Sequence, residues 1–559
     1  MKIDRQRLLT LAVVIGVAIG ITACGESKTL MTERDSDLSV KESIEESTRP
    51  NIIVILADDM QKGVTGHEGH PIINTPNIDK IAVGGTVFGN AFATSPVCTP
   101  SRTNLLTGLY ERRHGINFGS NSTMTEEAWA NTYPMLLKKS GYFVGYVGKN
   151  HTPIGITEKG GFGYKSGVMD NSFDYWYASH KHLSFYPKDK KAHKIFKNAK
   201  ADTQIEIMEE GVENFMEPNE AFKAGNNFLD SRPKGQPFAL LLNFNVPHAN
   251  STSSMQLRDS DLDLYKTAYR DQIDQITVPA TYVSEKDIKT PKLPKHVYNG
   301  EYIKTYNYVK TPETLKERKI REMQTISGID KLLGKLMAHL EAQGVADNTI
   351  IVFTSDHGLM HGEFGMGGKT LLYEPSVRIP MVIYDPRNTQ PVSKNDDLVA
   401  LVDIAPTILD LTNTPSLAEM HGKSLTPLMH KEKASGDNTQ WRQEIFLENM
   451  MMIQNYPRAE SVRTHKWKYI RYFDKKNDGP YEVVINNSIN GEQPIYEELY
   501  DIENDPHEIT NLIDKPEHQA IIEQLRLKNA ELVKKYRGEG PLNSHISEEK
   551  IKPIDPLVG

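Results

Sequence analysis

Five apolar runs, separated by helix-like segments, constrain how this chain can fold. They cover residues 51–57, 142–147, 238–244, 349–354 and 379–384. Each run is largely continuous, which is typical of strands buried on both faces of a sheet. Two of the intervening segments are predicted helices, over residues 132–140 and 311–343, and the longer one has apolar residues at helical spacing. Strands that alternate with helices predict an α/β fold with a mostly parallel central sheet flanked by helices.

The length and charge of the chain narrow the classes of function. With 559 residues, of which 38% are hydrophobic and 25% charged, the chain can bury a large core and form about two to four domains. Its net charge of −8 leaves no basic excess for binding a phosphate backbone, so nucleic acid is not an expected partner. An anionic substrate would need a local cluster of positive charge.

The first 49 residues are predicted to be an export signal and a tether. Basic residues precede an apolar run over residues 8–22, which is short for a membrane span of about 20 residues and has the pattern of a secretory signal. The small residues before Cys24 resemble the lipobox of bacterial lipoproteins. We therefore expect a signal peptide over residues 1–23, a lipidated Cys24 and a flexible tether over residues 24–49. An uncleaved anchor is the alternative; in both cases the protein is exported and membrane-bound, facing the periplasm or the cell surface.

The cysteine content of the chain singles out one thiol. The chain has only two cysteines, and the lipobox accounts for Cys24. Cys98 then has no partner for a disulfide, although exported proteins often use cysteines in that way. A lone thiol in an oxidising compartment is a liability, so its presence calls for another explanation.

Charged and imidazole side chains follow four of the predicted strands. In chain order they are Asp58 and Asp59, Lys149 and His151, His248, and Asp356 and His357. Each residue alone has an ordinary explanation, such as a turn, a helix cap or a structural histidine. The carboxyl ends of parallel strands meet at one edge of a sheet, where binding sites form. Together these residues therefore predict one site at that edge.

The three aspartates of this set predict a metal ion. Asp58, Asp59 and Asp356 would repel one another strongly at a low dielectric unless a cation lay between them. Carboxylate oxygens suit calcium or magnesium better than zinc. The chain also has no cluster of cysteines and histidines of the kind that zinc prefers.

The segment around Cys98 resembles the signature of a known family. Residues 95–108 read SPVCTPSRTNLLTG, with C-x-P-S-R followed by L-L-T-G. This is similar to the signature of the type I sulfatases, in which the cysteine is oxidised after synthesis to formylglycine. The resemblance runs from about residue 50 to 515 and includes four further elements: GKNH at 148–151, PH at 247–248, TSDHG at 354–358 and ELYD at 498–501.

The resemblance implies a fold and a metal centre. The fold is the alkaline-phosphatase-like α/β sandwich, with a catalytic domain over residues 50–435 and a smaller C-terminal α+β subdomain with an antiparallel sheet over residues 436–559. The cofactors are calcium and the formylglycine formed from Cys98. The implied metal ligands are Asp58, Asp59, residue 98, Asp356 and His357, where many members carry Asn in place of His357.

The resemblance also implies catalytic roles. Three basic residues would neutralise the sulfate group: Arg102, Lys149 and Lys369. His248 would donate a proton to the leaving oxygen, because a sugar alkoxide is otherwise a poor leaving group. His151 would remove a proton from the second hydroxyl of the hydrated formylglycine. Lys149, His248 and Lys369 would also bind the substrate, and His114 is expected to border the pocket.

The expected function is the removal of sulfate from a sulfated carbohydrate, an extracellular polysaccharide or its oligosaccharides. The alternatives are an arylsulfatase for small sulfate esters, a phosphoesterase of the same superfamily, and a degenerate lipoprotein that only binds sulfated glycan. The expected partners are the glycan, a formylglycine-generating or other sulfatase-maturing enzyme, and a membrane. The polar segments 152–215 and 250–311 either set the specificity or are surface insertions.

Overall fold

The computed structural model describes residues 49–539 and 544–545, apart from residues 119, 121, 157–162, 218–231, 298–305, 417, 431–440, 451–455 and 475–480. The predicted signal peptide, Cys24 and nearly all of the predicted tether lie outside the described residues. Among the helices that are described, none is both long enough and apolar enough to cross a membrane.

One half of the central sheet is parallel and contains four of the five predicted strands, together with β5, which was not predicted. β1 (Asn51–Ala57) lies between β6 (Phe238–Asn243) and β7 (Thr349–Ser355), and it pairs with both in parallel. β4 (Phe143–Asn150) lies beyond β6, and β5 (Tyr175–His180) forms the edge of this half. The carboxyl ends of all these strands therefore meet at one edge. The predicted α/β fold with a mostly parallel sheet is confirmed.

The run over residues 379–384 departs from the prediction. It forms two short strands, β10 (Arg378–Ile379) and β11 (Met381–Tyr384), where one was expected. Pro380 separates them, because proline has no N–H to donate to a strand ladder. β11 pairs with β7 in the antiparallel direction, so the parallel half of the sheet ends at β7.

Besides β5, two further strands of the sheet were not predicted. β2 (Thr86–Phe92) pairs antiparallel with β10 and β11, and β12 (Lys394–Ala400) pairs parallel with β2. Their sequences are TVFGNAF and KNDDLVA, in which glycine and polar residues interrupt the apolar pattern. Pairing with neighbouring strands outweighs the weak intrinsic preference of such residues for a strand.

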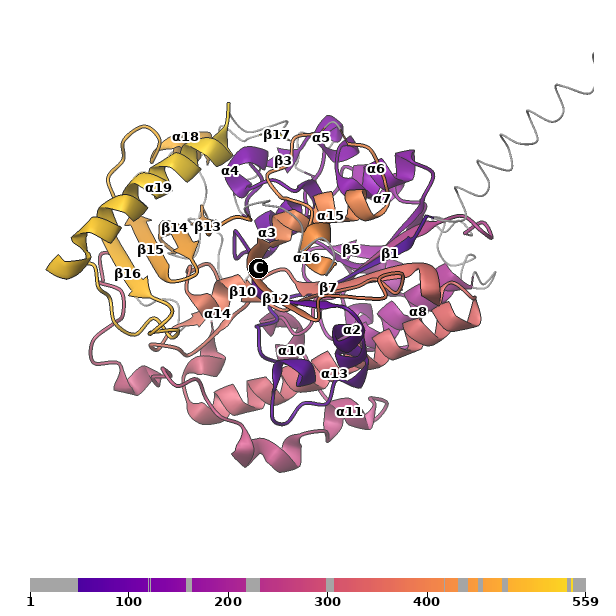
Figure 1. Cartoon of the computed structure of the whole chain (residues 1–559). Coiled ribbons are helices and arrows are strands. Elements are labelled where there is room, and N and C mark those ends of the chain that lie inside the picture. Colours follow the sequence, from indigo (N-terminus) through magenta and orange to yellow (C-terminus); the bar gives the residue numbers. More distant parts are fainter. Residues whose placement is uncertain are drawn as a thin grey trace, which may run out of the picture. The chain divides into compact units, whose positions relative to one another are not determined.

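Helices cover both faces of the sheet (Figure 1). Three lie on one face: α2 (Pro76–Gly84), α8 (Gln204–Met216) and α13 (Pro312–Ala342). Three lie on the other: α3 (Cys98–Thr107), α6 (Tyr133–Lys139) and α15 (Ile404–Leu411). Successive side chains of a strand point to opposite faces, so Ile53 packs in the core with α13, and Val54 packs in the core with α3.

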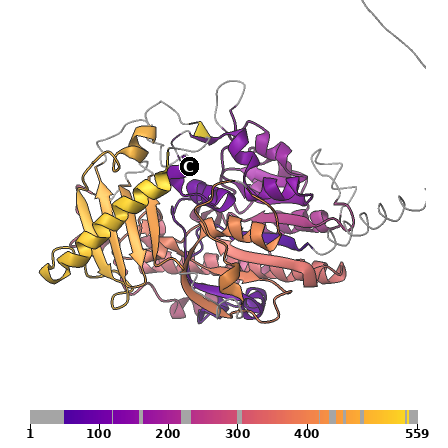
Figure 2. The ribbon, with the colours of Figure 1, turned by 45° about the horizontal axis from the view of Figure 1, so that its top comes forward.

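A second, antiparallel sheet follows in the C-terminal part of the chain, as predicted. Its strands pair in chain order: β13 (Glu444–Asn449), β14 (Arg458–Thr464), β15 (Trp467–Phe473) and β16 (Tyr496–Asp501). The helix α19 (Gln519–Arg537) lies along this sheet (Figure 2). Its apolar face, including Leu525 and Leu532, joins a core with side chains of both β14 and β15.

A buried arginine joins the second sheet to the segment that follows α3. Arg112, in the short helix α4 (Glu111–His114), is fully buried. Its Nε donates to Glu448 Oε2 at 2.6 Å, and its Nη2 donates to Glu460 Oε1 at 2.9 Å. Buried charges are tolerated when each has a partner, and removal of one partner leaves the others without compensation.

We expect Arg112→Met to lower the free energy of unfolding by about 3–5 kcal/mol, because the buried Glu448 loses its counter-charge and Glu460 keeps only Arg471 as a partner. Chemical denaturation measures this loss. Lys394→Met is the control, since Lys394 pairs with Asp396 at 2.9 Å with both side chains exposed, and exposed pairs contribute little. Equal losses in the two variants would contradict the role assigned to Arg112.

Candidate active site

Two of the predicted acids lie side by side because their strands are in register. Ala57 of β1 is paired with Ser355 of β7, and the next residue on each strand is an aspartate. The N–H of Asp59 then donates to Asp356 Oδ1 at 3.2 Å. Asp58, Asp59 and Asp356 are all buried. The structure therefore gathers three carboxylates at the carboxyl edge of the sheet.

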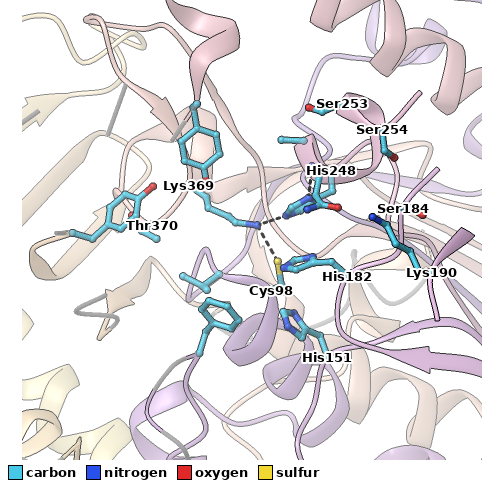
Figure 3. Close-up of a pocket in the computed structure, with 16 residues that line it drawn as sticks. Cys98, His151, His182, Ser184, Lys190, His248, Ser253, Ser254, Lys369 and Thr370 are labelled. Atoms are coloured by element: carbon cyan, nitrogen blue, oxygen red, sulfur yellow. Dashed lines mark hydrogen bonds between the residues drawn. The ribbon is translucent and has the colours of Figure 1, made fainter. Parts of the chain in front are cut away.

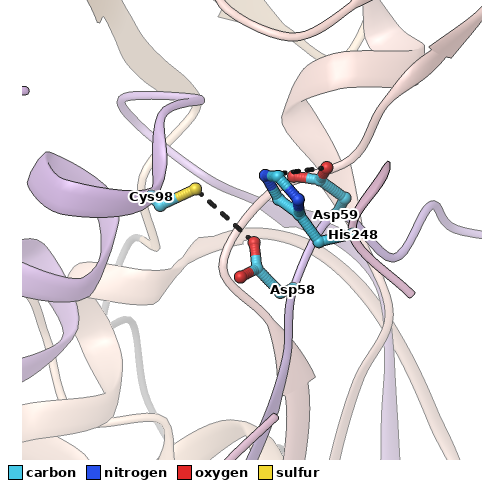
Figure 4. Close-up of side chains that lie close together, drawn as sticks. All are labelled: Asp58, Asp59, Cys98 and His248. Carbon is cyan, nitrogen blue, oxygen red and sulfur yellow. Dashed lines mark hydrogen bonds and ion pairs between the residues drawn. The ribbon is translucent and has the colours of Figure 1, made fainter. Parts of the chain in front are cut away.

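Cys98 faces this acid cluster from the first turn of α3. Its Sγ lies 3.5 Å from Asp58 Oδ1, 3.4 Å from His357 Nε2 and 2.9 Å from Lys369 Nζ. Cys98, Asp58, Asp356 and His357 each offer a possible metal-ligand atom, and these atoms all lie within 4.8 Å of one another. Figure 4 shows Cys98, Asp58, Asp59 and His248 directed toward a common point.

The donor atoms of this cluster fit a divalent metal ion. Asp59 Oδ2 is buried and, among the described residues, accepts no hydrogen bond, so it has a lone pair available for a cation. Carboxylate oxygens are the ligands that hard divalent cations prefer. His357 adds a nitrogen, and the charge of Asp356 raises the pKa of His357 to about 9, against the effect of burial. His357 can balance the acids as an imidazolium or by sharing a metal ion with Asp356.

Three cations pair with the three carboxylates. Arg102 Nε donates to Asp356 Oδ2 at 2.9 Å, the Lys149 ammonium donates to Asp58, and Lys369 Nζ donates to Asp59 Oδ1 at 2.9 Å. Burial alone would raise the pKa of Asp58, but the charges of Lys149, His248 and Arg102 hold that pKa well below its usual range.

Gly148 allows Lys149 to reach the acids. Gly148 has φ of 103°, a region that residues with a side chain rarely adopt. A Cβ at Gly148 would lie 2.0 Å from the carbonyl oxygen of Asn243 on the neighbouring β6. Only glycine therefore permits this approach of β4 to β6, and the next residue, Lys149, is fully buried against Asp58.

The long helix α13 holds the segment that carries His248. Arg318 of α13 donates from Nη2 to the carbonyl oxygen of Pro247 at 2.5 Å. Its Nε donates to Glu322 Oε1 at 2.6 Å, and that oxygen lies 3.0 Å from His361 Nε2. His248 in turn accepts from the N–H of Asn250 at 3.0 Å through Nδ1, which caps the helix α10 (Ala249–Ser253). The position of the imidazole is thus fixed from both sides.

Three imidazole rings form one wall above Cys98. The ring centroid of His182 lies 4.8 Å from that of His151 and 4.5 Å from that of His248. Burial lowers the pKa of all three, and nearby lysine charges lower it further. His248 Nε2 lies 3.1 Å from Lys369 Nζ and 3.6 Å from Asp59 Oδ2.

His182 is a site residue that the sequence did not single out. His182 Nδ1 lies 3.2 Å from Lys149 Nζ and 3.3 Å from Asn245 Oδ1. The shorter contact is to an ammonium group, which can only donate, so Nδ1 is assigned as an acceptor. In the neutral ring the proton is then on Nε2, and His182 lines the pocket as a hydrogen-bond donor. The signal in the sequence was SHKH at 179–182, which spans the end of β5, but β5 itself was not predicted.

A pocket of about 460 Å³ opens above Cys98. Figure 3 shows Cys98, His151, His182, His248 and Lys369 around its inner part. We call the part of the lining formed by Ser184, Lys190, Asn250, Ser253 and Ser254 the outer pocket; Tyr306 and Tyr456 also line the pocket. Arg102 and Lys149 are buried against the acids and do not line the pocket.

The structure does not bring His114 to the pocket, where it was expected. His114 is buried, with Nε2 2.6 Å from Asn104 Oδ1 and Nδ1 accepting from the N–H of Ile116 at 3.0 Å. Burial lowers the pKa of His114 to about 3. Its contacts join α4 to α3, so its role is in packing.

The fold and the site together define a hydrolase for anionic esters, with a candidate nucleophile beside a metal-binding acid cluster at the carboxyl edge of an α/β sheet. The family model named Sulfatase matches residues 50–414, and the model of the C-terminal part of N-sulphoglucosamine sulphohydrolase matches residues 362–484. The chain belongs to the sulfatase family and is a sulfuric ester hydrolase with the alkaline-phosphatase-like fold. This family implies a formylglycine and a metal ion.

Individual relatives resemble the chain over most of its length. It is 26% identical to N-acetylglucosamine-6-O-sulfatase of Bacteroides thetaiotaomicron, over 89% of this chain and 88% of the relative. It is also 26% identical to an arylsulfatase of Clostridium perfringens, over 86% of this chain and 93% of the relative. A protein solved in complex with its substrate, D-glucosamine-2-N,6-O-disulfate, has the same fold with a TM-score of 0.61 at 22% identity, over 88% of this chain and 99% of that one.

We expect calcium to raise the Tm of the EDTA-treated protein, because an ion that binds only the folded state stabilises it. At 100 times its Kd the gain is about 2.7 kcal/mol. Asp356→Asn should abolish this increase, since it removes a carboxylate from the cluster, whereas the exposed Asp263→Asn should retain it. Thermal unfolding followed by circular dichroism, with and without calcium, measures both. A full calcium-dependent shift in Asp356→Asn would exclude this metal site.

Proposed function

We propose that this sulfatase removes sulfate from a sulfated carbohydrate, through a formylglycine at position 98 and a calcium ion held by Asp58, Asp59, Asp356 and His357. The observation that carries the proposal is the position of Cys98. Its thiol touches the acid cluster on one side and Lys369 on the other, at the base of a pocket of about 460 Å³. Pockets for small ligands are typically about 300–1,000 Å³.

The Sγ of Cys98 stands in place of the oxygens of the modified side chain. A hydrated formylglycine supplies two hydroxyls on one carbon, one to attack sulfur and one whose ionisation later expels sulfate. Calcium at the acid cluster would favour ionisation of the attacking hydroxyl, as metals do for bound water.

The basic residues would offset the negative charge of the acids and of the substrate. Lys369 lines the pocket and lies 2.9 Å from Sγ, so it is placed to contact a sulfate oxygen directly. His182 would add an N–H donor from Nε2. Arg102 and Lys149 would act from beneath, because they neutralise Asp356 and Asp58 and so reduce repulsion of the anion.

The two other histidines would move protons. His248 would donate from Nε2 to the oxygen of the departing sugar once the Lys369 ammonium, which lies 3.1 Å from that nitrogen, turns to the sulfate. The negative charge of the bound sulfate favours protonation of the ring, which opposes the effects of burial and Lys369. His151 would accept a proton from the second hydroxyl. Burial and the charge of Lys149 lower its pKa, so the ring is neutral and able to act as a base.

A carbohydrate substrate is supported by the relatives and by the pocket. One relative is named an N-acetylglucosamine-6-O-sulfatase, and one structural neighbour was solved with a glucosamine disulfate as its substrate. Hydroxyl and amide groups of Ser184, Asn250, Ser253 and Ser254 line the outer pocket, and such groups suit sugar hydroxyls. The arylsulfatase relative supports small aryl sulfates as the second candidate.

The setting that we propose rests on the N-terminal sequence pattern. The protein would be exported, modified at Cys98 by a sulfatase-maturing enzyme and attached to a membrane through lipid on Cys24. A lipid-anchored enzyme of this kind would meet an extracellular sulfated polysaccharide or its fragments.

Sulfate release from defined sulfated oligosaccharides tests the proposed substrate class. We expect the enzyme, with formylglycine at position 98 verified by mass spectrometry, to release sulfate from at least one of them. Cys98→Ser is the control: serine has no second hydroxyl, so the variant should become sulfated, as seen in its intact mass, without turnover. Activity confined to small aryl sulfates would exclude the carbohydrate assignment.

His248→Asn tests the role of His248 as a proton donor. Asparagine can still cap α10 but is not an acid, so we expect sugar sulfates to lose about 10²–10⁴-fold in kcat. The kcat for 4-nitrophenyl sulfate should fall much less, because nitrophenolate leaves without a proton. The control is His465→Ala, in an exposed turn, which should leave kcat unchanged on both kinds of substrate. Equal losses on the two kinds of substrate would contradict the assignment.

A further inference from the structure

One lysine of the outer pocket differs from its charged neighbours on the same turn. The short helix η2 (Pro187–Asp189) carries Lys188 and Asp189, and Lys190 follows it directly. Lys188 Nζ lies 3.0 Å from Asp202 Oδ1, and Asp189 pairs with Arg258. Lys190 lines the pocket, and no acidic side chain of the described part of the chain forms an ion pair with it. Both charges within η2 are therefore paired, whereas Lys190 is left to face the pocket.

The backbone holds Lys190 in a defined position. The N–H of Lys190 donates to Pro187 O at 3.1 Å, and its carbonyl oxygen accepts from His193 N at 3.0 Å. The guanidinium of Arg258 stacks on Tyr186 at 3.7 Å from the ring centroid, next to the turn. Only the side chain of Lys190 therefore has freedom to adapt to a ligand.

The charge around Lys190 is not compensated within the pocket. Among the described residues that line the pocket, none is acidic. The other lysine of the lining, Lys369, is paired with Asp59 at 2.9 Å in the inner part. Figure 3 places Lys190 beside Ser184, on the same side of the pocket as Ser254 and away from Thr370. The outer pocket thus combines one unpaired cation with hydroxyl groups.

We propose that Lys190 binds a second anionic group of the substrate while the scissile sulfate lies at Cys98. This inference rests on the proposed function and narrows its substrate class to a glycan that carries two negative groups near each other. The second group is an oxyanion, either another sulfate or a uronic acid carboxylate, on the same sugar or the next one. A lysine ammonium binds both as a point charge with three donors.

The test compares oligosaccharides that carry one sulfate on neutral sugars, two sulfates, or one sulfate and a uronate. In Lys190→Met, we expect kcat/KM for the doubly anionic substrates to fall about 10-fold, or about 1.4 kcal/mol, mainly through KM. The singly charged substrate should not change. Lys190→Arg should retain the preference. The doubly anionic substrate whose kcat/KM falls more in Lys190→Met identifies the second group as sulfate or carboxylate.

Lys191→Met is the matched control, because Lys191 is the next residue and is also exposed but does not line the pocket. It should behave as the wild type on every substrate. If Lys190→Met has the same ratio of kcat/KM between doubly and singly charged substrates as the wild type, the subsite is overturned. Sulfate release from sugars in that same experiment would still uphold the proposed function. A wild-type enzyme that acts on aryl sulfates alone would overturn the proposed function, and the subsite with it.

Discussion

The pairing of β1 with β7 is the constraint on which the active site depends. With Ala57 opposite Ser355, the residue that follows on each strand is a buried aspartate. Two such carboxylates in a low-dielectric interior are tolerated only if positive charge lies against them. The chain supplies that charge from three distant segments, through Arg102 at the start of α3, Lys149 at the end of β4 and Lys369. The register of the sheet brings the aspartates together, and the fold can keep that register only if the cations lie against them.

The cations of the site differ in what they can reach. Arg102 and Lys149 are buried against the carboxylates and absent from the pocket lining, so they set the net charge of the acid cluster beneath the pocket. Lys369 belongs to both regions, since it pairs with Asp59 and touches Cys98. Lys190 belongs to the pocket alone. Positive charge thus extends from the metal-binding acids to the outer pocket, in the direction from which an anionic substrate enters.

The parts of the fold with continuous apolar strands could be predicted from the sequence. β1, β6 and β7 carry unbroken runs of branched apolar residues, and the fold class followed from them. β2 and β12 could not be predicted, because glycine and polar residues interrupt their apolar pattern and their strand state comes from pairing with neighbours. β5 begins with Tyr175, Trp176 and Tyr177, which favour a strand, so it was missed although its residues could have indicated it. The split at Pro380 could have been predicted, since proline interrupts a strand ladder, but the apolar residues on both sides of it were interpreted as one strand.

The same limit explains what could be predicted of the site. Asp58, Lys149, His248 and Asp356 lie within four residues of the ends of predicted strands, so topology alone indicated their convergence, and the structure places them together. His182 follows β5, which was not predicted, and its position beside Lys149 becomes visible only in three dimensions. His114 was expected at the pocket on motif position alone, with no strand to place it.

The division between sheet and loops suggests how this architecture separates chemistry from selectivity. The acids, Cys98 and Lys369 are tied to the sheet edge and to one another, so a change at one disturbs the charge balance of all. His182 and Lys190, by contrast, lie in the segment after β5, and Ser253 lies in α10 after β6. Lys190 and Ser253 can change with little effect on the acid cluster, whereas His182 lies against Lys149, the partner of Asp58. A family that keeps the edge and varies these two segments can retain sulfate hydrolysis while it exchanges one glycan for another.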